Sequence, residues 1–297
     1  MSFQNGKELL AICHERNETI AEVLLDCETR LTGVSKEEIK KEIGEMLEVM
    51  EESAHAALER PIPSISGMVG GDAKKAQAVT ASSLSGRVLM RAMAMALSTS
   101  EVNASMGKIV AAPTAGASGI LPAVLVTLKE ERGLDRAALT EAFLTATAIG
   151  TVIAKNATFS GAEGGCQAEC GSAAAMAASA IVTAMGGTPE MALDAANIAI
   201  TNIMGLVCDS VAGLVEYPCA LRNASGAVNA FTTADLVLAG IKPLVPFDEV
   251  VTAMYKVGKA LPYTLKETGL GGVAATPTGC TIRKQIFGED TAKIEHP

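Results

Sequence analysis

Three cysteines in short glycine-containing segments are the side chains of this 297-residue chain best suited to chemistry. Cys166 follows Gly-Ala-Glu-Gly-Gly, Cys208 follows Gly-Leu-Val, and Cys219 follows Glu-Tyr-Pro. Three thiolates can hold an iron–sulfur cluster while one iron has no protein ligand, and such an iron is a Lewis acid. The alternative is that each cysteine is a small buried hydrophobic side chain, which is common for a single free cysteine.

The other cysteines are weaker candidates for metal ligands. Cys170 makes a C-x3-C with Cys166, but on a helix this spacing also places two small apolar residues on one face. A structural zinc site needs four ligands, usually in paired short spacings, and the separation of Cys208 from Cys219 fits that pattern poorly. We expect the remaining three to be structural or incidental: Cys13, Cys27 and Cys280.

Histidine is nearly absent from the middle of the chain. The three histidines are His14, His55 and His296, far in sequence from the cysteine segments. A Ser-His-Asp or Cys-His hydrolase would need its base near the cysteine segments, so that class of enzyme is disfavoured. Any histidine base would have to come from another chain. Lys155 is the central lysine that a pyridoxal-phosphate enzyme would use, but the sequence has no recognisable phosphate-binding loop.

Arg222 is a basic residue in an apolar region and therefore needs a buried partner. Two roles are open to it: an ion pair within the protein, or a functional role in which it binds a substrate carboxylate or tunes the cluster. The candidate partners are Glu163, Glu169, Asp209 and Glu216.

Composition excludes several classes of protein. The net charge is −9, tryptophan is absent and no basic stripe occurs, so a nucleic-acid partner is not expected. Seven dispersed cysteines and the lack of a secretory pattern at the start favour a reducing cytoplasm. Residues 171–189 carry no charge, so a membrane span has to be considered. The stretch is only weakly apolar and the glycine pair 186–187 ends it early, so we expect a buried core helix and no membrane span.

Helical periodicity with little alternation predicts an all-α fold, a multi-helix bundle in which glycine-rich breaks form the cluster and substrate site. We expect a single unit over 1–297, with a charged arm of two helices over 1–60 and a catalytic core over 64–280. Predicted helix starts are Ser35, Asp135, Thr188-Pro189 and Asp248. The helices expected in the core are 73–100, 119–132, 136–157, 168–185, 190–206, 224–240 and 247–260.

The glycine-rich breaks are where a ligand can approach the backbone closely. The segment 112–122 precedes a helix, 160–167 is a second break, and 205–226 contains a third. Backbone N–H groups before a helix suit an anion.

Four motifs in order resemble the α subunits of iron–sulfur-dependent L-serine dehydratases. They are Ser66-Gly-Met-Val-Gly-Gly-Asp-Ala-Lys-Lys75, Lys108-Ile-Val-Ala-Ala-Pro-Thr-Ala-Gly-Ala-Ser-Gly-Ile-Leu-Pro122, Gly161-Ala-Glu-Gly-Gly-Cys166-Gln, and Gly205-Leu-Val-Cys208 through Pro218-Cys219-Ala-Leu-Arg-Asn223. The resemblance runs from about residue 64 to 280, which is most of the chain.

This resemblance implies deamination of L-serine to pyruvate and ammonia by a [4Fe–4S] cluster without pyridoxal phosphate. It implies Cys166, Cys208 and Cys219 as ligands, leaves Cys170 outside the ligand set, and pairs the chain with a separate β subunit. The family's β portion carries a histidine motif that has no counterpart here. The base is therefore expected from the β subunit, and no catalytic residue of this chain is assigned.

The segment 112–122 is our candidate for binding the carboxylate of L-serine. Backbone N–H groups would act with Thr114 and Ser118, so Ser118→Ala should raise KM strongly. The predicted substrate-binding residues are Lys108, Thr114, Gly116, Ser118, Arg222 and Asn223.

Two alternatives remain open on the sequence. A related iron–sulfur lyase would act on cysteine or another small β-substituted amino acid, and a helical metal-binding or partner-binding module would have no activity. The sequence leaves open the general base, the oligomeric state and whether Cys280 reaches the open iron.

Overall fold

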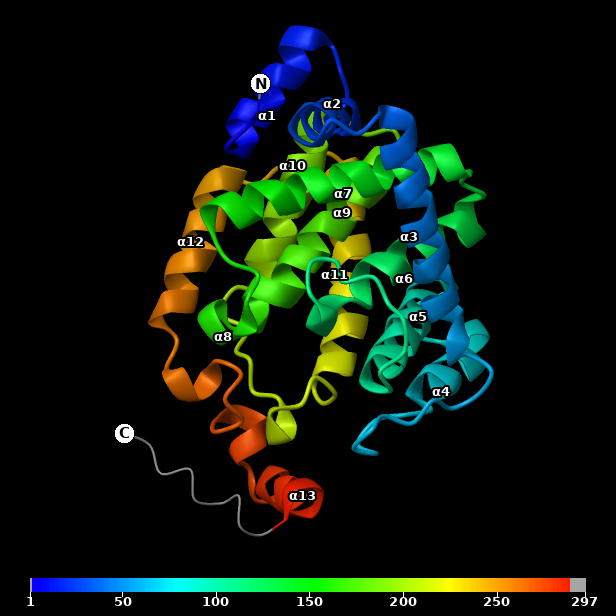
Figure 1. The fold of residues 1–297 in the computed structure, drawn as a ribbon, viewed down its shortest axis with the longest axis vertical. Helices are drawn as coiled ribbons and strands as arrows, with labels where there is room; N and C mark the ends of the chain where they lie inside the picture. Colours follow the sequence, from blue (N-terminus) through cyan, green and yellow to red (C-terminus); the bar gives the residue numbers. More distant parts are fainter. Residues whose placement is uncertain (1, 289–297) are drawn as a thin grey trace.

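A computed structural model describes residues 2–288, and the regular elements of this part are helices (Figure 1). The only β-type pairing among these residues is an isolated bridge between Cys208 and Lys266. The predicted all-α class is therefore confirmed. The α-helices are α1 (Gly6–Arg16), α2 (Ile20–Thr32), α3 (Lys36–Ala56), α4 (Asp72–Ala78), α5 (Arg87–Ala104), α6 (Ile120–Arg132), α7 (Arg136–Asn156), α8 (Gly161–Gly164), α9 (Ser172–Ala184), α10 (Pro189–Asn202), α11 (Cys219–Leu238), α12 (Phe247–Ala260) and α13 (Pro277–Phe287). The short turns are η1 (Thr80–Ser82), η2 (Ala115–Ala117), η3 (Gln167–Gly171), η4 (Val211–Gly213), η5 (Tyr263–Leu265) and η6 (Gly272–Ala275).

The N-terminal arm contains three helices, so the prediction of two was wrong. Asn17 ends α1 in the left-handed conformation with φ 53°, which asparagine tolerates. Thr19 then begins α2 through a capping box with Glu22. Ser35 begins α3 as predicted, accepting the N–H of Glu38 at 3.2 Å. Helix α2 packs on α7, and α3 packs on α5 and α6, so the apolar faces of the arm lie against the core.

The single helix predicted over 73–100 is two helices, α4 and α5. The chain turns through η1, becomes extended at Ser83 and reaches Gly86 with φ 83°, a conformation that glycine adopts without strain. Buried Glu101 of α5 accepts the N–H groups of Asp72 (2.7 Å) and Ala73 (2.9 Å) and so fixes the start of α4.

Helix α9 lies at the centre of the molecule and packs against α6, α7, α10 and α11 (Figure 1). Residues 172–182 are buried, which confirms the buried core helix predicted for this uncharged stretch. Small residues permit this close packing, because a Cβ added at Gly150 of α7 would lie 3.1 Å from the sulfur of Met176.

One helix of the described residues, α7, is long and apolar enough to cross a membrane by length and composition. Within its most apolar window, however, 67% is buried inside the protein. This burial is typical of a core helix.

Two of the predicted helix starts in the core are confirmed. The Asp135 carboxylate accepts the N–H of Ala138 at 2.9 Å to begin α7, and Thr188 caps α10 with Pro189 in its first turn. The helices expected over 119–132, 136–157 and 247–260 match α6, α7 and α12 to within one residue at each end.

Other boundaries and one predicted cap differ from the prediction. Helix α10 ends at Asn202 and not at 206, and α9 begins at Ser172 and not at 168, because the turn η3 precedes it. Helix α11 begins at Cys219 and not at 224, because the break before it ends at Pro218. Asp248 does not cap α12, which begins at Phe247. Its carboxylate instead accepts the N–H groups of Gly6 (2.7 Å) and Lys7 (3.0 Å), so it caps the start of α1 from a distant part of the chain.

Candidate active site

Cys166 and Cys170 are held together by the π-helical turn η3 between α8 and α9. Their Sγ atoms are 3.5 Å apart and both side chains are buried. The hydrogen bond with Cys170, together with burial, raises the pKa of the Cys166 thiol well above its ordinary value. Turns of this kind inside helices often occur at functional sites.

Gln167, which is 1% exposed, joins η3 to the segment that leads into Cys208. Its side-chain amide donates to the carbonyl oxygens of Gly164 (2.9 Å) and Met254 (3.1 Å). Its Oε1 accepts the N–H of Gly205 at 2.8 Å. Because every polar atom of this buried amide is satisfied, Gln167 fixes the two cysteine segments relative to each other.

Cys208 is positioned by its backbone, which forms the isolated bridge seen in the fold. Its N–H donates to the carbonyl oxygen of Leu265 (2.9 Å), and its own carbonyl oxygen accepts the N–H of Glu267 (2.7 Å). The neighbouring Cys166 thiol and burial raise the pKa of the Cys208 thiol far above its usual value. The two thiols therefore lie next to each other.

Cys219 is the first residue of α11 and is buried. Burial raises the pKa of its thiol to about 11, although the hydroxyl of Ser210, 3.3 Å from Sγ, acts in the opposite direction. The charges of Cys208 and Arg222 also affect the Cys219 pKa, and Arg222 follows Cys219 by one turn of α11.

Arg222 lies beside these thiols and has a carboxylate partner. Its guanidinium donates to Oδ1 of Asp209 (2.7 Å) and to the carbonyl oxygen of Val207 (2.9 Å). Burial opposes its charge, but the Cys166 sulfur and Asp209 raise the pKa of Arg222 above its usual value. The predicted buried ion pair is therefore confirmed, with Asp209 as the partner among the four candidates. A role in substrate binding stays a prediction.

Asn223 connects the segment 112–122 to α11. Its Oδ1 accepts the N–H of Gly119 (2.8 Å), and its amide donates to the carbonyl oxygens of Gly116 (2.7 Å) and Cys219 (2.8 Å). These contacts bring the predicted substrate segment to the helix that carries a predicted cluster ligand.

The side chains of Thr114 and Ser118 already have partners in the protein. The Ser118 hydroxyl donates to the carbonyl oxygen of Ala115 (2.8 Å), and the Thr114 hydroxyl donates to Oε1 of Glu169 (3.0 Å). None of the hydrogen bonds within residues 2–288 uses the N–H of Ala115 or Gly116. The donors that remain for a carboxylate are therefore these backbone groups.

The Glu169 side chain lies against two glycines. A Cβ added at Gly116 would lie 3.1 Å from Oε1, and one added at Gly161 would lie 2.7 Å from Oε2 and 3.2 Å from the sulfur of Cys208. Burial and the charge of Glu267 raise the pKa of Glu169 to about 7. In the described part of the chain no ion pair gives Glu169 a positively charged partner.

Lys108 is exposed, and no hydrogen bond or ion pair within residues 2–288 joins it to this group. Cys280 is also exposed, with its sulfur 4.0 Å from the carbonyl oxygen of Ala274. Cys13 and Cys27 are buried in the arm, as expected of structural cysteines. The structure thus brings Thr114, Gly116, Ser118, Arg222 and Asn223 to the cysteine region and leaves Lys108 unconnected.

The histidines of the described chain lie on other elements. His14 of α1 pairs with Glu190, and His55 of α3 pairs with Glu130 at 2.7 Å. His296 lies outside the described residues.

The donor set suits an iron–sulfur cluster better than a single ion. No group of three His, Cys, Asp or Glu side chains among the described residues is arranged to hold one metal ion. Cysteine ligands of a cluster bind different irons and need not converge on one point. Three soft thiol donors, with Arg222 to offset their negative charge, fit such a cluster.

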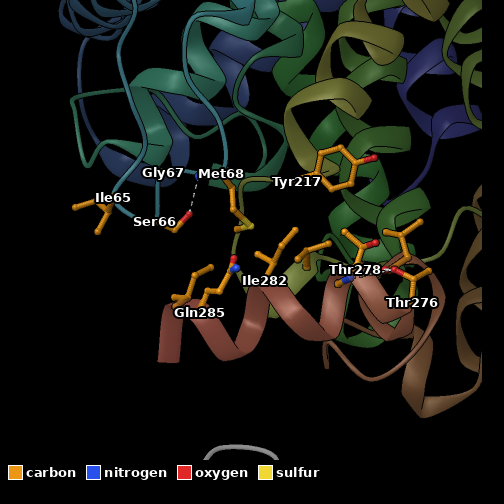
Figure 2. Close-up of a pocket in the computed structure, with 13 residues that line it drawn as sticks. Ile65, Ser66, Gly67, Met68, Tyr217, Thr276, Thr278, Ile282 and Gln285 are labelled. Carbon is orange, nitrogen blue, oxygen red and sulfur yellow. Dashed lines mark hydrogen bonds between the residues drawn. The ribbon is translucent and has the colours of Figure 1, made fainter. Parts of the chain in front are cut away.

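Two cavities flank this region. One of about 870 Å³ lies between residues 65–68 and α13, and no cysteine lines it (Figure 2). The other, of about 430 Å³, is lined by Cys170 and Arg222 together with residues at the end of α10 and in the break that follows. The second cavity is therefore the one that reaches the cysteine region.

The sequence reasoning missed Gln167 and Ser210. Gln167 directly follows Cys166, and Ser210 comes two residues after Cys208. A polar residue next to a predicted ligand in an apolar region needs a hydrogen-bond partner, and this need could have identified both. Gln167 bonds to Gly205, 38 residues away, and Ser210 lies against Cys219, nine residues away, and sequence spacing reveals neither contact.

Buried thiols, an arginine and a glycine-rich segment thus lie close together among the helices of this fold. Residues 5–274 match the family of serine dehydratase alpha chains. This match covers most of the chain, and the chain therefore belongs to that family.

Curated relatives agree with this assignment. The L-serine dehydratase alpha chain of Peptoniphilus asaccharolyticus is 53% identical over 289 residues, covering 97% of this chain and 99% of the relative. A probable L-serine dehydratase alpha chain of Bacillus subtilis (strain 168) is 49% identical and covers 96% of both chains. The L-serine dehydratase of Helicobacter pylori (strain ATCC 700392 / 26695) is 36% identical over 92% of this chain but only 62% of its own length.

Proposed function

We propose that this chain is the catalytic α chain of an L-serine ammonia-lyase, which converts L-serine to pyruvate and ammonia. The observation that carries the proposal is that Cys166, Cys208 and Cys219 are buried, with Arg222 one turn from Cys219 and bonded to the residue after Cys208, in a chain of the serine dehydratase family. We assign the enzyme to the cytoplasm, where thiols stay reduced.

Cys166, Cys208 and Cys219 would hold a [4Fe–4S] cluster through their thiolates. When bound, a cluster with one iron free of protein ligands supplies a Lewis acid that makes a hydroxyl a better leaving group. Cys170 stays outside this ligand set. Its sulfur lies 3.5 Å from that of Cys166, beside the proposed ligands.

Two surrounding side chains partly offset the cost of forming thiolates at this place. The pKa values of all three thiols are raised in the protein alone, so their ionisation needs compensating positive charge. Arg222, held by Asp209, supplies one charge, and the hydroxyl of Ser210 can donate to the Cys219 thiolate.

The segment 112–122 would bind the substrate carboxylate. The free N–H groups of Ala115 and Gly116 point to this role, and Asn223 holds the segment through the carbonyl oxygen of Gly116 and the N–H of Gly119. Among the predicted side chains, Thr114 and Ser118 shape the segment by their own hydrogen bonds. Lys108 and Arg222 stay predicted contacts to the carboxylate.

The proton balance of the reaction requires a base. Loss of the α-proton and of the 3-hydroxyl as water gives 2-aminoacrylate, which tautomerises and takes up water to yield pyruvate and ammonia. No histidine of the described chain lies in this group. We propose that a β subunit, a partner implied by the alpha-chain family, carries the base.

Anaerobic co-expression with a β partner tests this function. The purified complex should be brown, contain about four irons and four sulfides per α chain, and form pyruvate from L-serine. D-serine, L-threonine and L-cysteine serve as comparison substrates. Absence of pyruvate from L-serine with an intact cluster would overturn the proposal.

A further inference from the structure

Glu169 connects the two segments that meet at the proposed site. It lies on η3, between two cysteine residues of the chain, and its Oε1 accepts a hydrogen bond from Thr114 at 3.0 Å. Both of its oxygens lie against glycine backbone, at Gly116 and Gly161. Because glycine has no side chain, neither residue shields the Glu169 carboxylate from a bound ligand.

Within residues 2–288 no cation pairs with the Glu169 carboxylate. Arg222, the half-buried arginine beside the thiols, is engaged by Asp209 and by the carbonyl oxygen of Val207. The charge of Glu267 acts on Glu169 and disfavours its ionised form. A positively charged group from outside the chain would relieve this repulsion.

We propose that Glu169 binds the α-ammonium group of the amino-acid substrate and thereby selects amino acids over hydroxy acids. This inference rests on the proposed function, because it assigns a ligand group to the same site. Glu169 is a binding residue in this proposal and takes no part in removing the α-proton.

The position of Glu169 relative to the substrate segment supports this assignment. The free N–H groups of Ala115 and Gly116 belong to the same turn against which Oε1 lies. An α-amino acid carries its carboxylate and its ammonium on one carbon, so the two recognition groups must be neighbours. Backbone N–H donors beside a carboxylate match this pair of charges.

The substitution Glu169→Gln tests the inference in the assembled, cluster-containing enzyme. It keeps the shape of the side chain and an acceptor for Thr114 but removes the negative charge. We expect KM for L-serine to rise about 10- to 100-fold, the range for a lost hydrogen bond to a charged group, with a smaller change in kcat. Glu169→Asp should recover part of the affinity.

Calorimetric titration with L-alanine and L-lactate measures the same property without turnover. These ligands differ only in ammonium against hydroxyl at the α-carbon, and neither has a 3-hydroxyl to lose. The wild-type enzyme should bind L-alanine more tightly than L-lactate by about tenfold or more, and Glu169→Gln should abolish the preference. Iron content is measured alongside to verify that the cluster is retained.

Glu163→Gln is the matched control, because Glu163 lies on α8 in an exposed pair with Lys259. It should change neither KM nor the preference between the two ligands. Loss of kcat alone in Glu169→Gln, or equal weakening of L-alanine and L-lactate, would overturn the inference. A wild-type enzyme that prefers L-alanine but forms no pyruvate would refute the proposed function and not the ammonium site.

Discussion

At the scale of single residues, the site consists of buried thiols whose pKa values are raised. The cause is their burial and their mutual contact, as at Cys166 and Cys208. Two features act in the other direction, the guanidinium of Arg222 and the hydroxyl of Ser210. As free thiols they are therefore poor nucleophiles, and their ionisation would need compensating positive charge.

The proposed ligand set makes Cys166 and Cys170 different although their sulfurs are neighbours. Cys166→Ala should reduce iron and sulfide to well below four per chain, because a cluster ligand is lost. Cys170→Ala removes a thiol of equal burial and should leave the iron content close to that of the wild type. Iron and sulfide analysis of anaerobically purified protein measures both, and equal losses in the two variants would contradict the assignment.

At the scale of elements, the proposed site is assembled from breaks between helices and from the first turn of α11. The turn η3, the segment 112–122 and the start of α11 meet through side chains that bind backbone groups, chiefly Gln167 and Asn223. Such bonds are the main positional constraint on the irregular backbone, because it has no helical hydrogen bonds of its own.

Gln167→Ala should lower the free energy of unfolding by about 2–4 kcal/mol, because buried partners at Gly164, Met254 and Gly205 lose their hydrogen bonds and a cavity is left. Urea unfolding of the chain measures this loss. Gln285→Ala, at an exposed position of α13, should change it by less than about 0.5 kcal/mol. Equal stabilities of the two variants would show that Gln167 does not hold the segments.

At the scale of the whole molecule, the arm and the core are joined over large distances in sequence. Helix α2 packs on α7, and Asp248 of α12 caps the start of α1. The division into an arm over 1–60 and a core over 64–280 therefore reflects where the charges and the motifs lie in the sequence. It does not mark two separately packed parts. The single unit over 1–297 stays a prediction.

Asp248→Ala should loosen α1, because the N–H groups of Gly6 and Lys7 lose their acceptor, at a cost of about 1–2 kcal/mol as for other helix caps. Hydrogen exchange of α1 amides should become faster, while the amides of α9 keep their protection. Glu249→Ala, in the same turn of α12 but exposed, is the control. Unchanged exchange in α1 after Asp248→Ala would contradict this role.

Periodicity and capping residues were sufficient to predict most of the core helices and the all-α class. They failed where a helix breaks within an otherwise helical pattern, at Gly86, and where a cap serves a distant helix, at Asp248. Motif and composition located the three cysteines and Arg222. The partner of Arg222 and the role of Gln167 depend on contacts between separate segments, which local sequence does not encode.

The most direct test of the proposed site is Mössbauer spectroscopy of the 57Fe-labelled complex with and without L-serine. If Cys166, Cys208 and Cys219 hold three of the four irons, one iron in four should change its signal on addition of L-serine and the other three should not. Four equivalent irons that do not respond to L-serine, in a complex that still forms pyruvate, would contradict the assignment of an open iron as the site of reaction.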